Sequence, residues 1–533
     1  MGSTRLVATL TAKPSPEGGE IAALPARVGV LEVRADLTGD LEPADLRRHF
    51  GGELLYTLRS RAEGGAWSGD DDERRRRLTA AAVGDGGGSA GRSEGRGGYD
   101  LVDLEGERDL HSPLLDAIPP EKRLVSWHGP PTDLDGLGQR FERLSVVDAR
   151  YYKLIPTARQ PGEELAPLQL LQTLGREDVV AFAAGDVGVW TRLVAPRLGA
   201  PLVYGSAGED PAAPGQPSVA RLVRDYGLPE LRPLEGLFGI VGHPTAHSLS
   251  PRLHNGAYRE LGLPYLYLPF DTPSFGDFWL EVVESSCFEP WGLPLRGLSV
   301  TSPYKATALA VAGAASPLVE CIGGANTLVL HDGVWEAEST DPDGVVGPLI
   351  ERGVSVAGCR AAVWGTGGAG RAAAVGLARA GAEVTLVNRT EERGRAVAEA
   401  LEMAFSPLNE VDPGDFELLV HATPLGRSDD DPLPLDPAAV RVEATVVDMV
   451  YRDLAGGRPT ALVAALQERG IGVVEGREML LHQAFAQFRL MTGHELPPDL
   501  GRRLLGLDDP VAPGAPAASP TKRDTKRDGE EEV

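Results

Sequence analysis

Short apolar segments alternate with helix-like segments from residue 6 to residue 227. The apolar segments, each interpreted as a strand, cover residues 6–12, 28–37, 54–61, 99–107, 123–130, 146–156, 178–185 and 201–208. Helical candidates lie between most of them, and a last one follows at 217–227. Eight β–α units in succession predict a closed (β/α)₈ TIM barrel, in which parallel strands are surrounded by helices.

The rest of the chain predicts further domains, because 533 residues are too many for one hydrophobic core. A proline-punctuated segment, 228–233, marks the first boundary, and a second α/β pattern starts at residue 237. The glycine-rich segment 84–98 is expected to be a flexible loop, and the charged, proline-rich tail is expected to be disordered. The predicted domains are 1–228, 236–345, 346–474 and 475–505, followed by the tail 508–533.

Composition excludes several classes of protein. A net charge of −25 argues against nonspecific nucleic-acid binding. Three cysteines without a CxxC pair predict neither a disulfide framework nor a cysteine-rich metal site, so no metal is expected. The N-terminus has no signal-peptide pattern, and no apolar run is long enough to span a bilayer. We therefore expect a cytoplasmic protein that does not associate with membranes.

Polar residues gather at the carboxyl ends of the predicted barrel strands. They are Glu32, Arg34, Arg59, Glu63, His128, Lys153, Arg192 and Gln216. Each has an ordinary explanation: Glu32 and Arg34 as a structural ion pair, His128 as a core histidine, the other arginines as solvated charges. In a barrel, however, these strand ends meet at one mouth, where catalysis takes place. Eight such residues on successive strands favour an active site.

Lys153 is the most informative of these residues, because it lies within the apolar segment ARYYKLIP (149–156). One interpretation is a lysine whose stem packs while its ammonium reaches water. The other is an amine that burial keeps neutral, so that it can attack a carbonyl. The sequence of this segment leaves both open.

The motifs LEVRAD, TLRSRAEGG, SWH, YYKLIP and APGQ, in this order, resemble type I 3-dehydroquinate dehydratase over residues 4–227. The resemblance implies that Lys153 forms a Schiff base with 3-dehydroquinate, that His128 is the general acid/base and that Glu63 orients it. It implies substrate binding by Glu32, Arg34, Arg59, Arg192 and Gln216. The chain departs from the family at Ala212, where the lid usually has serine, at a cost of about 0.5–1.5 kcal/mol for one hydrogen bond.

A second group of motifs follows: Ser248 and Ser250 in SLSP, GLSVTSPYK (297–305), GANTL (324–328) and STD (339–341). The two serines alone would be helix caps. The whole set resembles shikimate dehydrogenase over residues 236–500, with Ser299 and Ser339 replacing the usual asparagines. The resemblance implies a catalytic pair, Lys305 and Asp341. It implies that shikimate or 3-dehydroshikimate is bound by Ser248, Ser250, Thr301, Asn326, Asp341, Gln483 and Tyr451.

Residues 359–390 have the order strand, glycine turn, helix, strand, which makes GTGGAG (365–370) a dinucleotide-binding fingerprint of a Rossmann domain. NAD sites usually have an acid after the second strand, whereas this chain has Asn388-Arg389-Thr390, which predicts NADP. Arg389 could alternatively be a solvated charge at the start of a helix. The predicted cofactor residues are Gly365, Thr366, Gly367, Gly368, Ala369, Gly370, Asn388, Arg389, Thr390, Arg393, Thr423, Met449 and Gly476.

Together these resemblances imply a bifunctional enzyme of the shikimate pathway. The first half would dehydrate 3-dehydroquinate, and the second would reduce 3-dehydroshikimate to shikimate with NADPH. Two alternatives stay open. One half could be a degenerate binding module, the barrel being the candidate because of Ala212, or the second half could act on quinate or use NAD.

Overall fold

The computed structural model describes residues 4–84, 97–110, 113–428, 430–452 and 459–507. The predicted loop and the predicted disordered tail therefore lie almost wholly outside the described residues. The chain packs as two units, one comprising the chain up to Ser339 together with 487–505, the other running from Thr340 to Ala486. These units are defined by packing, and the functional domain limits stay a prediction. No helix in the described ranges is both long and apolar enough to cross a bilayer.

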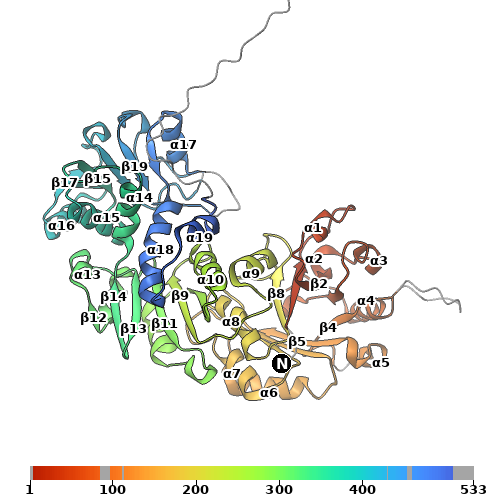
Figure 1. Ribbon diagram of the computed structural model, residues 1–533. Coiled ribbons are helices and arrows are strands. Elements are labelled where there is room, and N and C mark those ends of the chain that lie inside the picture. The colour runs from red at the N-terminus through yellow and green to blue at the C-terminus, as the bar shows by residue number, and fades with distance from the viewer. Residues whose placement is uncertain (1–3, 85–96, 111–112, 429, 453–458, 508–533) are drawn as a thin grey trace, which may run out of the picture. The chain divides into compact units, whose positions relative to one another are not determined.

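The first sheet is an eight-stranded parallel barrel sheet with the strand order β7-β6-β5-β4-β3-β2-β1-β8 (Figure 1). Its strands are β1 (Arg5–Leu10), β2 (Val28–Arg34), β3 (Glu53–Thr57), β4 (Leu101–Glu105), β5 (Arg123–Gly129), β6 (Tyr151–Pro156), β7 (Val179–Ala181) and β8 (Leu202–Ser206). The predicted fold is confirmed, but the expected closure is incomplete. No ladder joins β7 to β8 among the described residues, since β7 is only three residues long.

Helices surround this sheet. They are α1 (Gly19–Ala22), α2 (Ala35–Thr38), α3 (Pro43–Leu46), α4 (Asp71–Val83), α5 (Leu114–Ala117), α6 (Leu134–Leu144), α7 (Ala166–Leu174), α8 (Val189–Val194) and α9 (Val219–Tyr226). Side-chain caps at Asp70, Asp133 and Ser218 start α4, α6 and α9. The expected strand 28–37 is shorter than predicted, because α2 begins at Ala35. The expected strand 146–156 begins only at Tyr151.

The second sheet belongs to the same unit and has the order β10-β9-β11-β13-β14-β12. Its strands are β9 (Gly236–Gly242), β10 (Tyr265–Asp271), β11 (Leu295–Val300), β12 (Ala314–Ala315), β13 (Thr327–His331) and β14 (Val334–Glu338). Its helices are α10 (Ser250–Leu261), α11 (Phe275–Phe278), α12 (Lys305–Val311), α13 (Pro317–Ile322) and α19 (Pro498–Leu504). Strand β13 runs antiparallel to β11 and β14, so this sheet is mixed.

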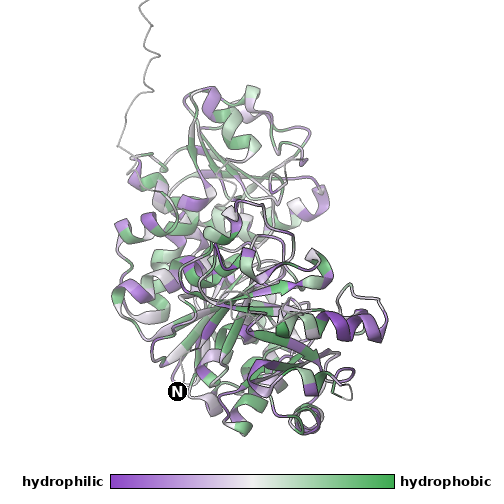
Figure 2. Ribbon diagram, turned by 90° about the vertical axis from the view of Figure 1, so that its right-hand side faces the viewer, coloured by the Kyte–Doolittle hydropathy of each residue, from purple (hydrophilic) through white to green (hydrophobic). Residues whose placement is uncertain are grey.

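One apolar core joins the barrel to the second sheet. Trp190 on α8 is 1% exposed, and its ring packs against Phe270, Phe288 and Trp291 at centroid distances of 5.6, 5.3 and 6.4 Å. Figure 2 shows that the strands are mostly hydrophobic, while the helices carry both hydrophobic and hydrophilic residues. The barrel and the sheet are thus packed together by aromatic side chains.

The third sheet lies in the second unit and is parallel throughout, with the order β17-β16-β15-β18-β19-β20. Its strands are β15 (Arg360–Trp364), β16 (Glu383–Asn388), β17 (Ala404–Pro407), β18 (Leu418–His421), β19 (Thr445–Asp448) and β20 (Gly472–Val474). Its helices are α14 (Asp341–Glu351), α15 (Gly368–Arg379), α16 (Glu391–Ala400), α17 (Ala461–Glu468) and the first part of α18 (Gly476–Thr492). This is the doubly wound arrangement of a Rossmann domain.

Candidate active sites

Lys153 lies on β6, inside the barrel, and is 5% exposed. Its Nζ is 3.8 Å from Asp103 Oδ2, 4.0 Å from Glu32 Oε1 and 4.2 Å from the centroid of the Tyr204 ring. Burial lowers the pKa of Lys153, although Glu32 and Asp103 partly oppose this shift. The ammonium does not reach bulk water, so the interpretation of Lys153 as a solvated surface lysine is wrong.

The two carboxylates beside Lys153 are held by other donors. Glu32 accepts hydrogen bonds from Thr9 Oγ1 at 2.7 Å and Thr57 Oγ1 at 2.8 Å. Asp103 accepts from Arg59 Nη2 at 2.6 Å and from Ser126 Oγ. Because these bonds take up part of each negative charge, Lys153 does not have a carboxylate to itself. Asp103 was missed in the sequence, and its signal was an acid between apolar residues within β4, in LVDLE (101–105).

His128, Glu63 and Arg59 form one connected group. His128 Nδ1 lies 3.1 Å from Glu63 Oε2, which also accepts from Arg59 Nη1 at 2.9 Å. Burial lowers the pKa of His128 well below its usual value, and the charges of Arg59 and Lys153 lower it further. Burial also raises the pKa of Glu63 to about 8, against the opposing effect of Arg59. His128 is therefore a neutral imidazole, the form that can accept a proton.

Arg34 contacts the segment that follows β8. Arg34 does not pair with Glu32, so the interpretation of these two residues as a structural ion pair is wrong. Its guanidinium makes two bonds of 2.8 Å to Asp36, and its Nη1 donates to the carbonyl of Ala212 at 3.5 Å. The Ala212 N–H in turn donates to Gln216 Oε1 at 2.9 Å. Backbone groups of Ala212 thus fasten this segment to predicted site residues, although its side chain has no hydroxyl.

Arg192 is a buried cation without a counter-ion in the described chain. It is 3% exposed, lies 4.4 Å above the Phe182 ring and donates from Nη1 to the carbonyl of Tyr204 at 2.8 Å. Its Nε is buried without a partner. Burial lowers the pKa of Arg192 to about 9, so it remains charged at neutral pH. A buried, unpaired guanidinium favours an anionic ligand such as a carboxylate.

Five predicted site residues lie near the carboxyl ends of β9 and β11 or just after them: the catalytic candidate Lys305 and the substrate-binding candidates Ser248, Ser250, Thr301 and Asn326. The Thr301 N–H donates to the carbonyl of Val241 at 3.0 Å, which holds the two strand ends together. A Cβ at Gly242 would lie 2.2 Å from Thr301 Cγ2, so glycine is required there. Ser248 Oγ accepts from the Ser250 N–H at 3.2 Å, but the N-cap residue of α10 is Leu249, so neither serine caps the helix.

Three further predicted residues belong to the second unit. Asp341 begins α14 and is 2% exposed, Gln483 lies on α18, and Tyr451 follows β19. The proposed pairing of Lys305 with Asp341 thus joins residues of two separately packed units. It stays a prediction.

The predicted cofactor residues lie at the carboxyl ends of adjacent parallel strands of the third sheet. Gly365, with φ of +105°, follows β15, and Gly367 caps α15. A Cβ at Gly370 would lie 1.9 Å from the Gly365 carbonyl oxygen, so only glycine permits this close turn. The buried Thr366 Oγ1 has no partner in the described chain. Thr423, Met449 and Gly476 follow β18, β19 and β20.

The end of β16 carries the residues that distinguish NADP from NAD. The strand ends at Asn388, and Arg389, Thr390 and Arg393 are exposed after it. Sequence reasoning missed Arg371, which directly follows the glycine fingerprint. Burial lowers the pKa of Arg371, and the nearby charge of Arg393 lowers it further. The two guanidinium groups therefore share one positively charged region, which suits a 2′-phosphate.

Comparison with known proteins agrees with this geometry. Residues 13–231 match the family model of type I 3-dehydroquinase, 240–328 that of the shikimate dehydrogenase substrate binding domain, and 476–505 that of the shikimate 5'-dehydrogenase C-terminal domain. A shikimate dehydrogenase (NADP(+)) of Rubrobacter xylanophilus is 36% identical over 283 residues, which are 51% of this chain and 96% of that protein.

Two further relatives extend the comparison. A chloroplastic bifunctional 3-dehydroquinate dehydratase/shikimate dehydrogenase of Arabidopsis thaliana is 29% identical over 506 residues, 88% of this chain and 79% of that protein. The crystal structure of shikimate 5-dehydrogenase from Thermus thermophilus in complex with NADP(H) and shikimate is 34% identical. It covers 51% of this chain and 99% of that one, with a TM-score of 0.46.

The barrel with its buried lysine and the Rossmann sheet with its glycine turn define an α/β enzyme with two active centres. The chain belongs to the shikimate dehydrogenase family, and its N-terminal barrel is a type I 3-dehydroquinase domain.

Proposed function

We propose that this chain dehydrates 3-dehydroquinate to 3-dehydroshikimate in the barrel and reduces 3-dehydroshikimate to shikimate with NADPH in its second half. The observation that carries the first step is the buried Lys153 of lowered pKa inside the barrel, close enough to His128 for its charge to lower the pKa of that histidine. The second step, reduction with NADPH, is supported by the glycine turn at 365–370 and by the arginines after β16.

In the barrel, the neutral Lys153 amine attacks the C3 ketone, and loss of water leaves an iminium. The iminium withdraws electrons from C2, so neutral His128 can remove the C2 proton. His128 then returns this proton to the C1 hydroxyl, which leaves as water while the double bond forms. Hydrolysis of the iminium releases the product and restores Lys153. Glu63 orients His128 through the 3.1 Å contact.

The substrate carboxylate is assigned to Arg192, because its buried charge lacks a counter-ion in the described chain. Arg34 and Gln216 hold the Ala212 segment that would close over the substrate. Glu32 and Arg59 complete the polar lining. Arg59 acts mainly through its bonds to Asp103 and Glu63, so it sets the charge around Lys153 and His128.

In the second half, Lys305 and Asp341 are assigned to proton transfer at the C3 oxygen. Ser248, Ser250, Thr301, Asn326, Gln483 and Tyr451 are assigned to the substrate. The fingerprint 365–370 would hold the pyrophosphate at the start of α15, and Asn388, Arg389, Thr390 and Arg393 would hold the 2′-phosphate. Thr423, Met449 and Gly476 are assigned to the cofactor cleft. NADPH supplies the hydride.

A coupled assay tests both steps. Purified protein with 3-dehydroquinate and NADPH should oxidise NADPH and accumulate shikimate. Failure that is rescued by 3-dehydroshikimate would identify the barrel as the degenerate half, while failure with both substrates would contradict the reductase assignment. Parallel assays with quinate and with NADH address the remaining alternatives. We further propose a cytoplasmic location and the domain limits 1–228, 236–345, 346–474 and 475–505.

A further inference from the structure

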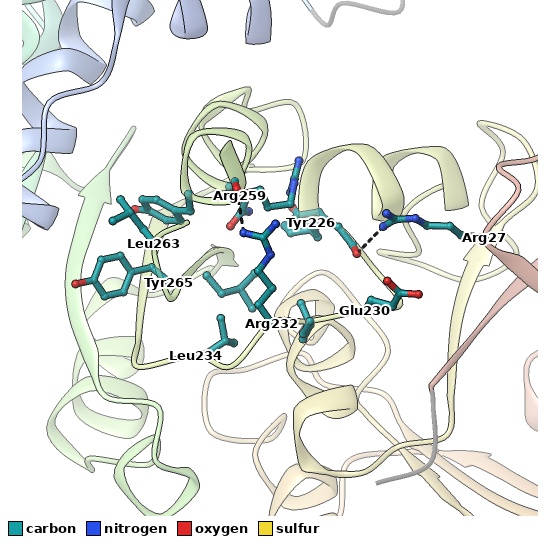
Figure 3. A pocket seen from close by; sticks show the side chains of 13 residues that line it. Arg27, Tyr226, Glu230, Arg232, Leu234, Arg259, Leu263 and Tyr265 are labelled. Carbon is teal, nitrogen blue, oxygen red and sulfur yellow. Dashed lines mark hydrogen bonds between the residues drawn. The ribbon is translucent and has the colours of Figure 1, made fainter. Parts of the chain in front are cut away.

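A pocket of about 240 Å³ lies within the first unit, where the barrel, the linker and the second sheet meet (Figure 3). Its lining comes from the loop before β2, the end of α9, linker residues 230–234, the second half of α10 and the start of β10. The candidate catalytic residues follow strand ends, whereas Arg27 precedes β2 and Tyr265 begins β10. The pocket is therefore at the opposite ends of these strands from both proposed active sites.

Three arginines line the rim: Arg27, Arg232 and Arg259. Figure 3 shows Arg27 reaching in from the barrel side and Arg232 rising from the linker. Their hydrogen bonds in the described chain go to backbone carbonyls: Arg27 to Gly227 at 3.2 Å, Arg232 to Arg259 at 3.0 Å. Arg259 donates to the carbonyls of residues 225 and 224 at 3.3 and 2.6 Å.

The lining residues therefore carry more positive than negative charge. Burial lowers the pKa of Arg259, and repulsion by Arg27 and Arg232 adds to this effect, although the nearby carboxylates of Asp225 and Glu260 oppose it. Glu230 is the one carboxylate among the lining residues. Three guanidinium groups against one carboxylate favour an anion, and their planar forks match a carboxylate.

Tyr258 belongs to the lining, but its hydroxyl is not open to the pocket. The residue is 1% exposed, and its hydroxyl oxygen is itself buried. Its ring packs against Phe238, Tyr265 and Phe488 at centroid distances of 6.1, 5.7 and 5.5 Å, so it supports the apolar wall.

The remaining wall is apolar and aromatic. It consists of Tyr226, Leu231, Leu234, Leu263, Tyr265 and Leu266. Rings surrounded by such side chains gain from burial and from edge-to-face contacts. A volume of about 240 Å³ is smaller than that of most small-molecule sites, which limits the occupant to a single ring with short substituents.

We propose that this pocket binds a small aromatic carboxylic acid, with the carboxylate on the arginine rim and the ring against the apolar wall. The acid would contact the barrel, the linker and the second sheet together. It would stabilise this unit without competing with the substrates of either reaction.

The first test measures binding of 3-hydroxybenzoate and 4-hydroxybenzoate to the full chain by calorimetry. We expect at least one of them to bind one site per chain with a Kd below about 1 mM. Arg232→Met should weaken this binding at least about tenfold. The matched control is Arg296→Met, because exposed Arg296 also donates one bond to a linker carbonyl, that of Glu235, at 3.1 Å but does not line the pocket.

Equal affinity of the wild type and Arg232→Met would overturn the proposal, since the acids would then occupy another site, such as a substrate carboxylate site. No binding of either acid would overturn it as well. Both variants should retain both turnovers, which shows that they are folded.

The second test compares these acids with inorganic phosphate, which probes the charge alone. The hydroxybenzoates should bind more tightly than phosphate, because their rings also pack against the apolar wall. Phosphate binding as tight as that of the hydroxybenzoates would refute an aromatic ligand.

Discussion

At the scale of single residues, burial prepares two basic side chains of the barrel for different tasks. Lys153 has its pKa lowered beside Glu32 and Asp103, so a neutral amine becomes accessible. Arg192 has its pKa lowered to about 9 and keeps its charge at neutral pH. The same desolvation therefore yields a nucleophile in one case and an anion receptor in the other, because the two groups start from different pKa values.

Replacing Lys153→Met should abolish dehydration and leave shikimate dehydrogenase activity unchanged, because methionine keeps the stem but removes the amine. Borohydride reduction in the presence of 3-dehydroquinate should add a covalent mass to the wild type and none to the variant, as measured by mass spectrometry. Lys122→Met is the control, since Lys122 lies in the same barrel and donates hydrogen bonds to the carbonyls of Ala82 and Tyr99, away from the proposed site residues. Covalent trapping in Lys153→Met would contradict the assignment.

His254 predicts a pH dependence of stability. The ring stacks on Tyr267 at 4.4 Å, and burial lowers the pKa of His254 to about 3, while Gln487 opposes this shift. The unfolded chain therefore binds a proton more tightly, so the contribution to stability is present above pH 6.5 and is lost as the pH falls toward 3. From pH 7 to pH 5 this loss amounts to about 2 kcal/mol.

The variant His254→Phe should show a smaller fall in melting temperature between pH 7 and pH 5 than the wild type, measured by calorimetry. Phenylalanine keeps the stacked ring and removes the titration. An identical fall in both proteins would show that His254 does not titrate in this window.

At the scale of elements, the turn from β15 into α15 depends on one close approach. A side chain at Gly370 has no room beside the carbonyl of Gly365, which lies 1.9 Å from the position of a Cβ. The helix start that would hold the pyrophosphate is thus positioned by backbone packing alone.

Gly370→Ala should weaken NADPH binding at least about tenfold and reduce reductase activity, because the turn must open. Dehydration in the barrel should be unaffected. NADPH fluorescence titration measures the affinity. Gly472→Ala is the control in the same sheet, since its Cβ would meet nothing closer than 3.8 Å. Normal NADPH affinity in Gly370→Ala would refute the fingerprint assignment.

The Ala212 segment gives a second prediction at this scale. Ala212→Ser restores a hydroxyl next to backbone groups already bonded to Arg34 and Gln216. One new hydrogen bond of about 0.5–1.5 kcal/mol would lower the KM for 3-dehydroquinate about two- to tenfold with little change in kcat. Steady-state kinetics measure this. An unchanged KM would mean that the serine has no role in this chain.

At the scale of the whole molecule, the barrel and the second sheet do not pack as independent domains. They form one packed unit in which Trp190 of the barrel inserts among Phe270, Phe288 and Trp291. The pocket lined by Arg27, Arg232 and Arg259 lies at another part of this junction. A change at the junction is therefore expected to reach both halves.

Trp190→Ala should destabilise this unit by about 3–5 kcal/mol, the usual cost of removing a buried tryptophan. Both activities should then be lost at a lower temperature than in the wild type, as measured by residual activity after heating. Trp67→Ala, which removes a 9% exposed tryptophan from the barrel away from the junction, should affect dehydration first. Loss of dehydration alone in Trp190→Ala would contradict a shared unit.

The sequence by itself determined the eight β–α units, the Rossmann fingerprint and most of the candidate site residues. These signals are local: hydrophobic periodicity, glycines that permit a close turn, and motif order carry them without knowledge of distant contacts.

Only the tertiary structure decided how these pieces meet. Asp103 and Arg371 joined their sites because strands and helices distant in sequence bring side chains together. Arg34 paired with Asp36 rather than Glu32, because the chain turns into α2 at Ala35 while Glu32 bonds to Thr9 and Thr57. Packing between elements likewise decides three further features. They are the absence of a β7–β8 ladder in the described chain, the contacts of Trp190 with the second sheet, and the pocket lined by three arginines. Such contacts leave no periodic pattern in the chain, since desolvation and charge pairing are fixed only when the elements pack.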